Sequence, residues 1–227
     1  ASGIPAAVEL ARKADVTIVA VGDVIDQIGE TRDRSDLDLS GGQLPLLKAV
    51  KATGTKLVVV LINSKPLVIP WLAENADAIV EAFNPGMAGG AAIAKILFGD
   101  ENPMGKLTVS FPRTIGGQPV YYQQIPGWHG NRNGTYDARA LYPFGFGLSY
   151  TEFQYTNLRL AKATVMSGES VVVNVDVKNV GARTGTEIVQ LYLNDVFTTY
   201  STPSKTLKRF ARVRLEPGQK TSLRFEL

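Results

Sequence analysis

The sequence predicts an α/β three-layer sandwich with a mostly parallel sheet, followed by an all-β sandwich. Two patterns lead to this prediction. Before Pro112, apolar runs of strand length alternate with amphipathic segments at intervals of roughly twenty residues, which is typical of βαβ units covered on both faces of a sheet. From about Phe153 onward, apolar residues recur at every second position between turn signals, which is typical of antiparallel strands.

Composition and the positions of proline and glycine predict the elements of the first part. Pro5 stands where a first helical turn tolerates a missing N–H, and Gly54 and Gly99 end two later helices. Continuous apolar runs of four to eight residues have the character of buried strands. The expected order is helix 5–14, strand 15–21, a helix between 40 and 54, strand 56–62, a short helix within 66–75, strand 76–83, helix 89–98 and strand 106–111.

Three segments are expected. Residues 1–112 form the α/β domain, and residues 113–151, rich in Gly, Pro, Asn and Tyr, form an irregular connecting segment. Residues 152–227 form the β-sandwich. Only about five or six alternating strands fit there, whereas such a sandwich has about seven. We therefore expect the sandwich to be truncated, that is, incomplete at its C-terminal end.

Composition and charge narrow the function classes. The 227 residues are 44% hydrophobic and 20% charged, as in an ordinary globular protein. Lys plus Arg minus Asp plus Glu is 24 − 21 = +3, with both signs interspersed, so we expect no nucleic-acid partner and no anionic-membrane surface. No apolar run approaches the roughly 20 residues of a membrane span, so no membrane partner is expected.

The chain has no cysteine and a single histidine, His129. This composition excludes a thiolate nucleophile, a Cys-ligated metal and a multi-His metal site, and it disfavours a Ser-His-Asp triad. The absence of cysteine leaves the redox compartment open.

The most informative stretch runs from Gly22 to Gln43, directly after an apolar run, and carries eight ionisable side chains. At the carboxyl end of a parallel strand, loops carry the chemistry of α/β proteins. Glu30, within Gly-Glu-Thr, is the candidate, because a carboxyl group beside a cleft can protonate a leaving group if its pKa is raised. The alternative is a solvated loop glutamate, which residue type alone favours.

The remaining charges of this loop have a structural interpretation. Residues of alternating sign favour local pairing, so we interpret these side chains as a salt-bridge network that holds the loop. They are Arg32, Asp33, Arg34, Asp36 and Asp38.

Two other stretches have competing interpretations. The glycine-rich run 85–90 lies between a strand and a helix like a phosphate-binding loop, but it lacks the spacing and the lysine of one, so close packing is favoured. Asn133 begins a triplet that fits an N-glycosylation sequon. Aromatic residues of the connecting segment either stack on sugar rings or pin the loop, with neither favoured: Tyr121, Tyr122, Trp128, His129 and Tyr136.

Several separated strings are long and idiosyncratic: GDVIDQIGETRDRSDLDLSGGQLPLL, NPGMAGGAAIAKILFGDENPMGKLTVSFPR, LYPFGFGLSYTEF and, in the sandwich, VDVKNVGARTGTEIVQLYL, SKTLKRF and LEPGQ. In this order the chain resembles the C-terminal half of glycoside hydrolase family 3, the β-glucosidase and β-xylosidase family. The resemblance covers nearly the whole chain. It implies an α/β sandwich domain, a connecting segment and a fibronectin type III-like domain.

The resemblance also implies a role for Glu30. In that family the acid/base glutamate lies in the loop matched here by residues 29–34, and Asp23 and Asp26 are the neighbours most easily confused with it. Two carboxyl groups and a water suffice for the reaction, so neither a metal nor an organic cofactor is expected. Substrate-binding residues are not identified, and the family favours a periplasmic or secreted location.

One departure from the family pattern limits the activity of this chain. Family members carry an N-terminal (β/α)8 barrel with the nucleophilic aspartate, and nothing before Ala1 supplies it. We interpret the chain as the C-terminal part of an exo-acting retaining β-glycosidase that acts on a β-linked oligosaccharide or aryl glycoside. Its partner would be the barrel domain or subunit, and the isolated chain is expected to be inactive. The alternative is a non-catalytic carbohydrate- or partner-binding module.

Overall fold

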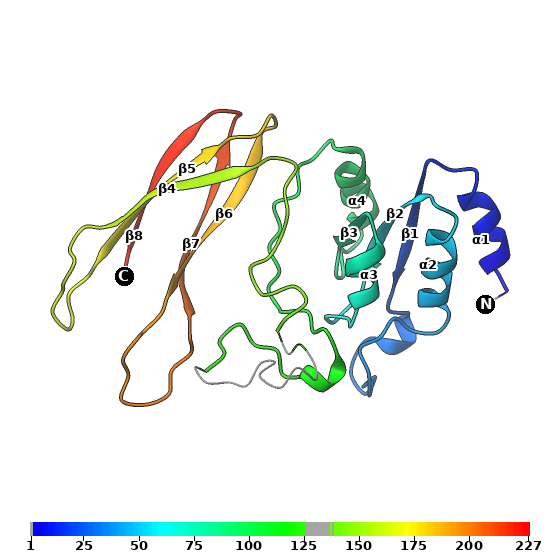
Figure 1. Ribbon diagram of the computed structural model, residues 1–227, viewed down its shortest axis with the longest axis horizontal. Helices are drawn as coiled ribbons and strands as arrows, with labels where there is room; N and C mark the ends of the chain where they lie inside the picture. The colour runs from blue at the N-terminus through cyan, green and yellow to red at the C-terminus, as the bar shows by residue number, and fades with distance from the viewer. Residues whose placement is uncertain (1, 126–136, 138) are drawn as a thin grey trace. The chain divides into compact units, whose positions relative to one another are not determined.

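The computed structural model describes residues 2–125, 137 and 139–227, and these fall into two compact units. The first unit takes its described residues from 1–95, 109–120 and 129–143. The second takes them from 96–108, 121–128 and 144–227. Each unit has its own strands (Figure 1). The domain boundaries expected at residues 112 and 152 stay a prediction.

A three-stranded parallel sheet forms the centre of the first unit, in the order β1-β2-β3. Its strands are β1 (Val16–Gly22), β2 (Lys56–Ile62) and β3 (Ala78–Glu81). The helices of this part of the chain are α1 (Ile4–Ala11), α2 (Gln43–Lys51), α3 (Pro70–Asn75) and α4 (Gly89–Phe98), with short 3-10 helices η1 (Ile25–Gln27) and η2 (Ile115–Gly117). The predicted parallel sheet with interspersed helices is confirmed. No helix in the described part of the chain is long and apolar enough to cross a bilayer.

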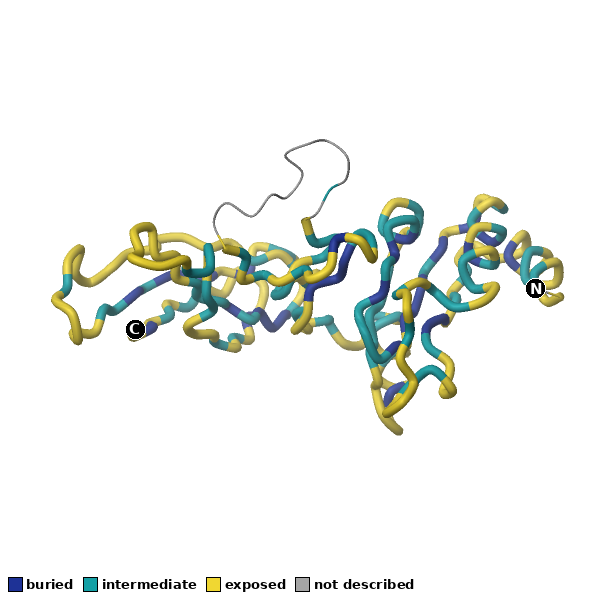
Figure 2. The backbone as a smooth tube through the Cα atoms, turned by 90° about the horizontal axis from the view of Figure 1, so that it is seen from below, coloured by how far each residue is buried: buried dark blue, intermediate teal, exposed yellow. Residues whose placement is uncertain are grey.

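The central strand β2 is the most deeply buried, because it has a neighbour on each side. Leu57, Val59 and Leu61 of β2 are completely buried, and α2 adds Leu47 and Val50 (Figure 2). Burying an aliphatic side chain of this size stabilises the fold by about 1.5–3 kcal/mol relative to leaving it exposed. This cluster therefore fixes α2, the helix at which the charged loop ends, against β2.

The first strand, β1, is less buried than its apolar run predicted. Val16 and Ile18 are 50% and 47% exposed, whereas Val21 is buried. Alternate side chains of a strand point to opposite faces of the sheet. Among the described residues, one face of β1 is thus largely open, and β1 differs here from a strand buried on both sides.

The strand expected at 106–111 is wrong. Leu107 exchanges backbone hydrogen bonds with Gly145 and Phe146 in the second unit, and Phe111 forms an isolated antiparallel bridge with Tyr142 in the first. The chain passes from one unit to the other between Thr108 and Val109. Both contacts are made with residues 141–146, but they do not join into a continuous ladder, so no strand forms here.

The second unit contains two antiparallel sheets. Its strands are β4 (Phe153–Leu160), β5 (Val172–Asn179), β6 (Gly185–Leu193), β7 (Thr206–Leu215) and β8 (Lys220–Glu226). One sheet has the order β4-β5-β8, and the other pairs β6 with β7. The alternating strands predicted from the sequence are therefore confirmed.

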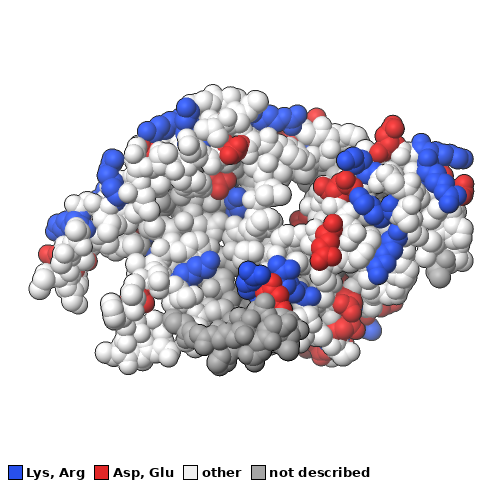
Figure 3. Space-filling model, in the orientation of Figure 1, with Lys and Arg blue, Asp and Glu red and all other residues white. Residues whose placement is uncertain are grey.

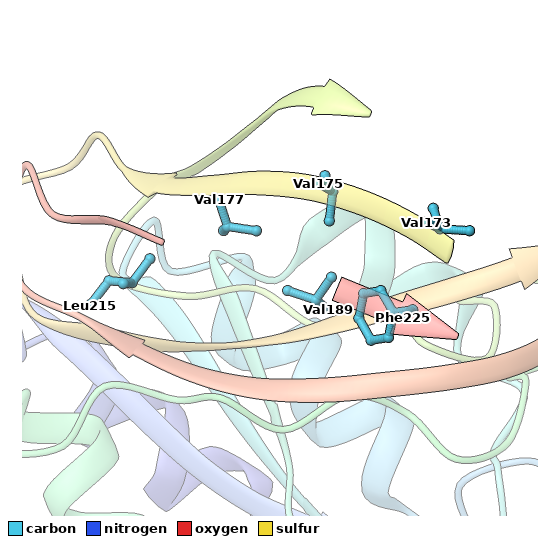
Figure 4. Packing of buried hydrophobic residues seen from close by; sticks show 6 residues of the cluster. All are labelled: Val173, Val175, Val177, Val189, Leu215 and Phe225. Atoms are coloured by element: carbon cyan, nitrogen blue, oxygen red, sulfur yellow. The ribbon is translucent and has the colours of Figure 1, made fainter. Parts of the chain in front are cut away.

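The core of this unit lies between the two sheets. Alternate valines of β5 point to the same side, toward residues of β6, β7 and β8 (Figure 4). Since period-two alternation places every second side chain on one face, this packing follows directly from the sequence pattern. The buried cluster consists of Val173, Val175, Val177, Val189, Leu215 and Phe225.

A segment from the α/β part of the sequence packs with this second unit. Asn102 donates a hydrogen bond to the Thr184 carbonyl oxygen at 3.1 Å. Its Oδ1 accepts hydrogen bonds from the Ser149 hydroxyl at 2.9 Å and the Tyr150 N–H at 2.8 Å. Residues 96–108 thereby belong to the compact unit of the sandwich, held by the segments that directly precede β4 and β6 rather than by the parallel sheet.

Candidate active site

The charged loop leaves the sheet at the carboxyl end of β1, the region drawn in blue below β1 and α2 in Figure 1. Gly22, the last residue of β1, has a φ of +144°, and a Cβ there would lie 1.9 Å from the Ile62 carbonyl oxygen. Only glycine allows the two strands to stay paired to this point. The Gln43 side chain accepts a hydrogen bond from the Gly22 N–H at 2.7 Å and donates one to its carbonyl oxygen at 2.8 Å. The two ends of the loop are thus tied together.

Asp23, the first residue of the loop, is a buried carboxylate whose side chain is 1% exposed. Its Oδ2 accepts hydrogen bonds from the Ser64 N–H at 2.8 Å, the Ser64 hydroxyl at 2.7 Å and Lys65 Nζ at 3.1 Å. Its Oδ1 accepts one from Arg34 at 3.2 Å. Burial alone would raise the pKa of Asp23, but the hydrogen bonds from Ser64 and Lys65 outweigh it and hold the pKa below its ordinary value. Asp23 is therefore a charged anchor, unsuited to donating a proton.

Arg34 links the returning limb of the loop, residues 34–38, to Asp23. Besides Asp23, its guanidinium group donates hydrogen bonds to Asp36 Oδ1 at 2.7 Å and to the Asp38 carbonyl oxygen at 2.6 Å. The salt-bridge interpretation is confirmed for Arg34 and Asp36, whereas Asp38 takes part through its backbone. It is wrong for Arg32 and Asp33, whose side chains make no ion pair or hydrogen bond among the described residues. On the face drawn in Figure 3, basic and acidic side chains are interleaved rather than gathered by sign.

Glu30 lies on the tip of a tight turn between these limbs. The Arg32 N–H donates a hydrogen bond to the Gly29 carbonyl oxygen at 3.3 Å. Gly29 and Thr31, on either side of Glu30, have φ values of +112° and +63°. A positive φ at a β-branched residue costs of order 1–3 kcal/mol, and such strain concentrates at functional sites. The turn presents Glu30 outward, exposed to solvent.

The surroundings of Glu30 leave its carboxylate available. No hydrogen bond or ion pair reaches it from residues 2–125, 137 or 139–227. Asp26, the other neighbour easily confused with it, is exposed on η1. A hollow of about 480 Å³ lies nearby, lined by Gln27 and by mostly polar residues between Asp33 and Gly41. Glu30 does not line this hollow, and it is exposed to solvent at the turn.

A second carboxyl group at the same edge of the sheet escaped the sequence analysis. Glu81 ends β3, and its Oε1 accepts a hydrogen bond from the Phe83 N–H at 2.8 Å. Burial raises the pKa of Glu81 to about 7, the nearby negative charge of Asp23 adds to this effect, and the hydrogen bond from the Phe83 N–H opposes it. Glu81 Oε2 and Asn63 Oδ1 are both buried acceptors without a hydrogen-bond partner among the described residues. The only signal in the sequence was a charged residue within an apolar run.

The aromatic candidates and the Asn133 triplet of the connecting segment lie only partly within the described residues. Trp128, His129, Asn133 and Tyr136 lie outside the described residues. The Tyr122 ring stacks on Phe144 with centroids 4.4 Å apart and meets Tyr192 edge-on at 6.0 Å. That contact pins the chain within the second unit, in line with the structural interpretation.

The glycine-rich run 85–90 also has a local structural explanation. A Cβ at Gly89 would lie 2.5 Å from the Pro85 side chain, and Gly86 has a φ of +71°. Close packing and turn geometry therefore account for these glycines. Within the residues that the structure describes, no three His, Cys, Asp or Glu side chains gather in a way that could hold a metal ion.

Comparisons with known proteins match this architecture. The family model for the glycosyl hydrolase family 3 C-terminal domain matches residues 1–150, and the model for the fibronectin type III-like domain matches residues 187–227. The chain is 42% identical to a β-xylosidase of Formosa agariphila, over 99% of this chain and 32% of that protein. It is 39% identical to a periplasmic β-glucosidase of Salmonella typhimurium, over 99% of this chain and 31% of that protein.

Solved structures of β-glucosidases are also similar to this chain. A β-glucosidase from Erythrobacter marinus has a TM-score of 0.93 and 42% identity, covering 99% of this chain and 31% of that one. A β-glucosidase from Listeria innocua in complex with glucose has a TM-score of 0.93 and 35% identity, covering 100% of this chain and 33% of that one. The chain thus spans about a third of the length of the relatives it matches.

The fold places the chain in a class that joins a parallel α/β layer to a fibronectin type III-like sandwich. The chain belongs to glycosyl hydrolase family 3, and it corresponds to the C-terminal domain of that family followed by the fibronectin type III-like domain.

Proposed function

We propose that this chain supplies the general acid/base of a retaining β-glycosidase, and that Glu30 is this group. Glu30 protonates the glycosidic oxygen as the leaving group departs and then deprotonates water in the second step. The substrate class is a terminal β-linked sugar of an oligosaccharide or aryl glycoside. Relatives named β-xylosidase and β-glucosidase support this class.

The observation that carries the proposal is the availability of Glu30. Its carboxylate stands on a strained turn at the carboxyl edge of the sheet, free of partners among the described residues. The competing carboxylate, Asp23, is buried and hydrogen-bonded on both oxygens. An acid/base group must be reachable by substrate and must change protonation state, and of these two only Glu30 is exposed.

The proposal assigns the nucleophile to another part of the enzyme. Retaining glycosidases need a second carboxyl group about 5–5.5 Å from the acid/base. We assign this group to an N-terminal (β/α)8 barrel, on the same polypeptide or on a partner subunit. Curated relatives about three times as long as this chain support such a division of labour. By itself the chain is expected to be inactive.

The test uses the dependence of the rate on the leaving group. Purified chain is assayed alone and combined with a barrel-bearing polypeptide of the family, on aryl β-glucosides and β-xylosides. We expect activity only in the combination. In that enzyme, Glu30→Gln should lower kcat/KM by about 10²–10⁴ for a weakly acidic phenol as leaving group. The loss should be far smaller for 2,4-dinitrophenol, which leaves without protonation.

The matched control is Asp26→Asn, which removes an exposed carboxylate from the same loop. It should leave both rates unchanged. Hydrolysis by the isolated chain that disappears in Glu30→Gln would overturn the division of labour. Sugar binding with no activity in any combination, and with no response to Glu30→Gln, would favour a non-catalytic binding module.

A further inference from the structure

We infer that Asp23 is a positioning residue that holds the turn bearing Glu30 in place by joining both limbs of its loop to the carboxyl edge of the sheet. This inference rests on the proposed function of Glu30 and adds a second residue to it. Asp23 touches neither substrate nor reacting atoms in this role; it acts through the backbone of the loop.

Asp23 is attached to the sheet from two sides. Its backbone N–H donates a hydrogen bond to the Ile62 carbonyl oxygen at 3.0 Å, directly after the last residue of β1. Its carboxylate accepts hydrogen bonds from the backbone and hydroxyl of Ser64, which follows β2. Backbone and side chain of one residue thus fasten the start of the loop to the end of the neighbouring strand.

Both limbs of the loop reach this carboxylate through cations. Lys65 Nζ lies 3.1 Å from Asp23 Oδ2 and 3.4 Å from the Gln27 carbonyl oxygen. It therefore connects the first limb of the loop, residues 24–27, to Asp23. Arg34, on the returning limb, lies 3.2 Å from Asp23 Oδ1. Only residues 28–33 separate these two attachment points, and Glu30 lies among them. The turn that carries Glu30 is therefore attached to Asp23 at both of its ends.

The charge of Asp23 matters for this function. Two cations converge on a carboxylate that is almost inaccessible to water, where ion pairs are stronger than at the surface. An asparagine has nearly the same shape but only one acceptor oxygen, and its amide hydrogens would face Arg34 or Lys65. At least one limb would lose its attachment. A displacement of the reacting group by about 1 Å can cost about 10²-fold in rate.

The first test asks whether Asp23→Asn affects proton donation in particular. In the enzyme combined from chain and barrel-bearing polypeptide, kcat/KM is measured for an aryl glycoside with a weakly acidic phenol and for the 2,4-dinitrophenyl glycoside. We expect the variant to lose at least about tenfold more on the first substrate than on the second, because a misplaced acid impairs only the step that needs a proton. A merely structural loss of folded enzyme would lower both values by the same factor.

The second test needs no activity. Amide hydrogen exchange on the isolated chain should become faster at residues 24–34 in Asp23→Asn and stay unchanged in β2. The matched control is Asp33→Asn, an exposed carboxylate on the same loop without a hydrogen bond or ion pair to the described residues. If Asp23→Asn does not fold, Arg34→Gln releases only the returning limb and should show the same two effects to a smaller degree.

The outcomes separate this inference from the proposed function. Equal losses on both substrates, or unchanged exchange in the loop, would overturn the positioning role while leaving Glu30 as the acid/base if Glu30→Gln retains its own leaving-group dependence. A Glu30→Gln enzyme without that dependence would overturn the proposed function and this inference with it.

Discussion

At the scale of single residues, Glu81 shows how position in the fold changes the chemistry of an ordinary side chain. It ends β3 beside Asn63 and within the electrostatic reach of Asp23. Its Oε2 and Asn63 Oδ1 are two unpartnered buried acceptors among the described residues, and a proton on the carboxyl group would give one of them a hydrogen to donate. We therefore expect Glu81 to keep its proton to near neutral pH.

The consequence is a pH-dependent stability. Burial raises the pKa of Glu81 from 4.5 to about 7, so the folded state holds a proton that the unfolded state releases between these values. The contribution of Glu81 is fully present below pH 4.5 and is lost as the pH rises through about 7. At 1.36 kcal/mol per pKa unit, the loss has a ceiling of about 3 kcal/mol.

The variant Glu81→Gln tests this expectation. Glutamine is neutral at every pH, and its amide nitrogen can donate to Asn63 Oδ1 while Oε1 keeps the bond from Phe83. Urea denaturation at pH 5 and pH 8 should show the variant more stable than the parent at pH 8, with a smaller difference between the two pH values. If Glu81→Gln lowered the free energy of unfolding by the same amount at pH 5 and at pH 8, the raised pKa of Glu81 would be contradicted.

The candidate site could be predicted from the sequence only in part, for reasons that lie at this scale. A charged loop after an apolar run indicates the carboxyl edge of a sheet, so the region around Glu30 was accessible to pattern alone. The role of Asp23 was not, because Ser64 and Lys65 lie some forty residues away in the sequence. Nothing about an aspartate, taken by itself, distinguishes a buried anchor from an exposed acid.

At the scale of elements, the junction of β1 with β2 depends on the absence of one side chain. A Cβ on Gly22 would lie 1.9 Å from the carbonyl oxygen and 2.6 Å from the carbonyl carbon of Ile62. These are backbone atoms, so they cannot turn aside as a flexible side chain would. The two strands would have to separate where the charged loop begins.

We expect Gly22→Ala to cost more than about 3 kcal/mol in unfolding free energy, since it combines backbone overlap with an unfavourable φ. Gly54→Ala is the matched control: its φ is +87°, but a Cβ there meets no atom within 4 Å. Strain alone should cost that variant about 1–2 kcal/mol. Chemical denaturation compares the two; equal losses would show that the contact with Ile62 is relieved elsewhere.

Elements were predicted best where the pattern reports local burial. Continuous apolar runs identified β2 because a central parallel strand is covered on both faces. The same pattern overstated β1, since the sequence does not say whether a second face is covered. The strand expected at 106–111 failed for a different reason: alternation was present, but its backbone makes only separate contacts with residues 141–146 and no continuous ladder. Hydrogen-bond pairing over long sequence separations is not encoded in local periodicity.

At the scale of the whole molecule, the compact units do not follow the order of the sequence. Asn102 belongs to the segment 96–108, yet its side chain makes hydrogen bonds to Ser149, Tyr150 and Thr184 in the second unit. Losing these bonds leaves partly buried donors and acceptors unpaired. Asn102→Ala should therefore destabilise the sandwich by about 2 kcal/mol.

Hydrogen exchange resolves where that loss falls. In Asn102→Ala, amides of β5 and β6 should exchange faster, whereas amides of β2 should not. Glu101→Ala, at the exposed neighbouring position, should leave exchange in both parts unchanged and alter the free energy of unfolding by no more than about 0.5 kcal/mol. Faster exchange in β2 but not in the sandwich would contradict the assignment of this segment to the second unit.

The attachment of residues 96–108 to Ser149 and Tyr150, just before β4, and to Thr184 and Glu187 at the start of β6 restricts how this fold can be recombined. A chimera that grafts a relative's sandwich at the start of β4 would bring foreign partners to the native Asn102 and Lys106, which bond to the Thr184 carbonyl oxygen and to Glu187 of β6, and the contacts at this junction would no longer match. Swapping the upstream strip together with the graft preserves these contacts. Domain shuffling in this family should therefore favour crossover points before Ile96 over points near Phe153.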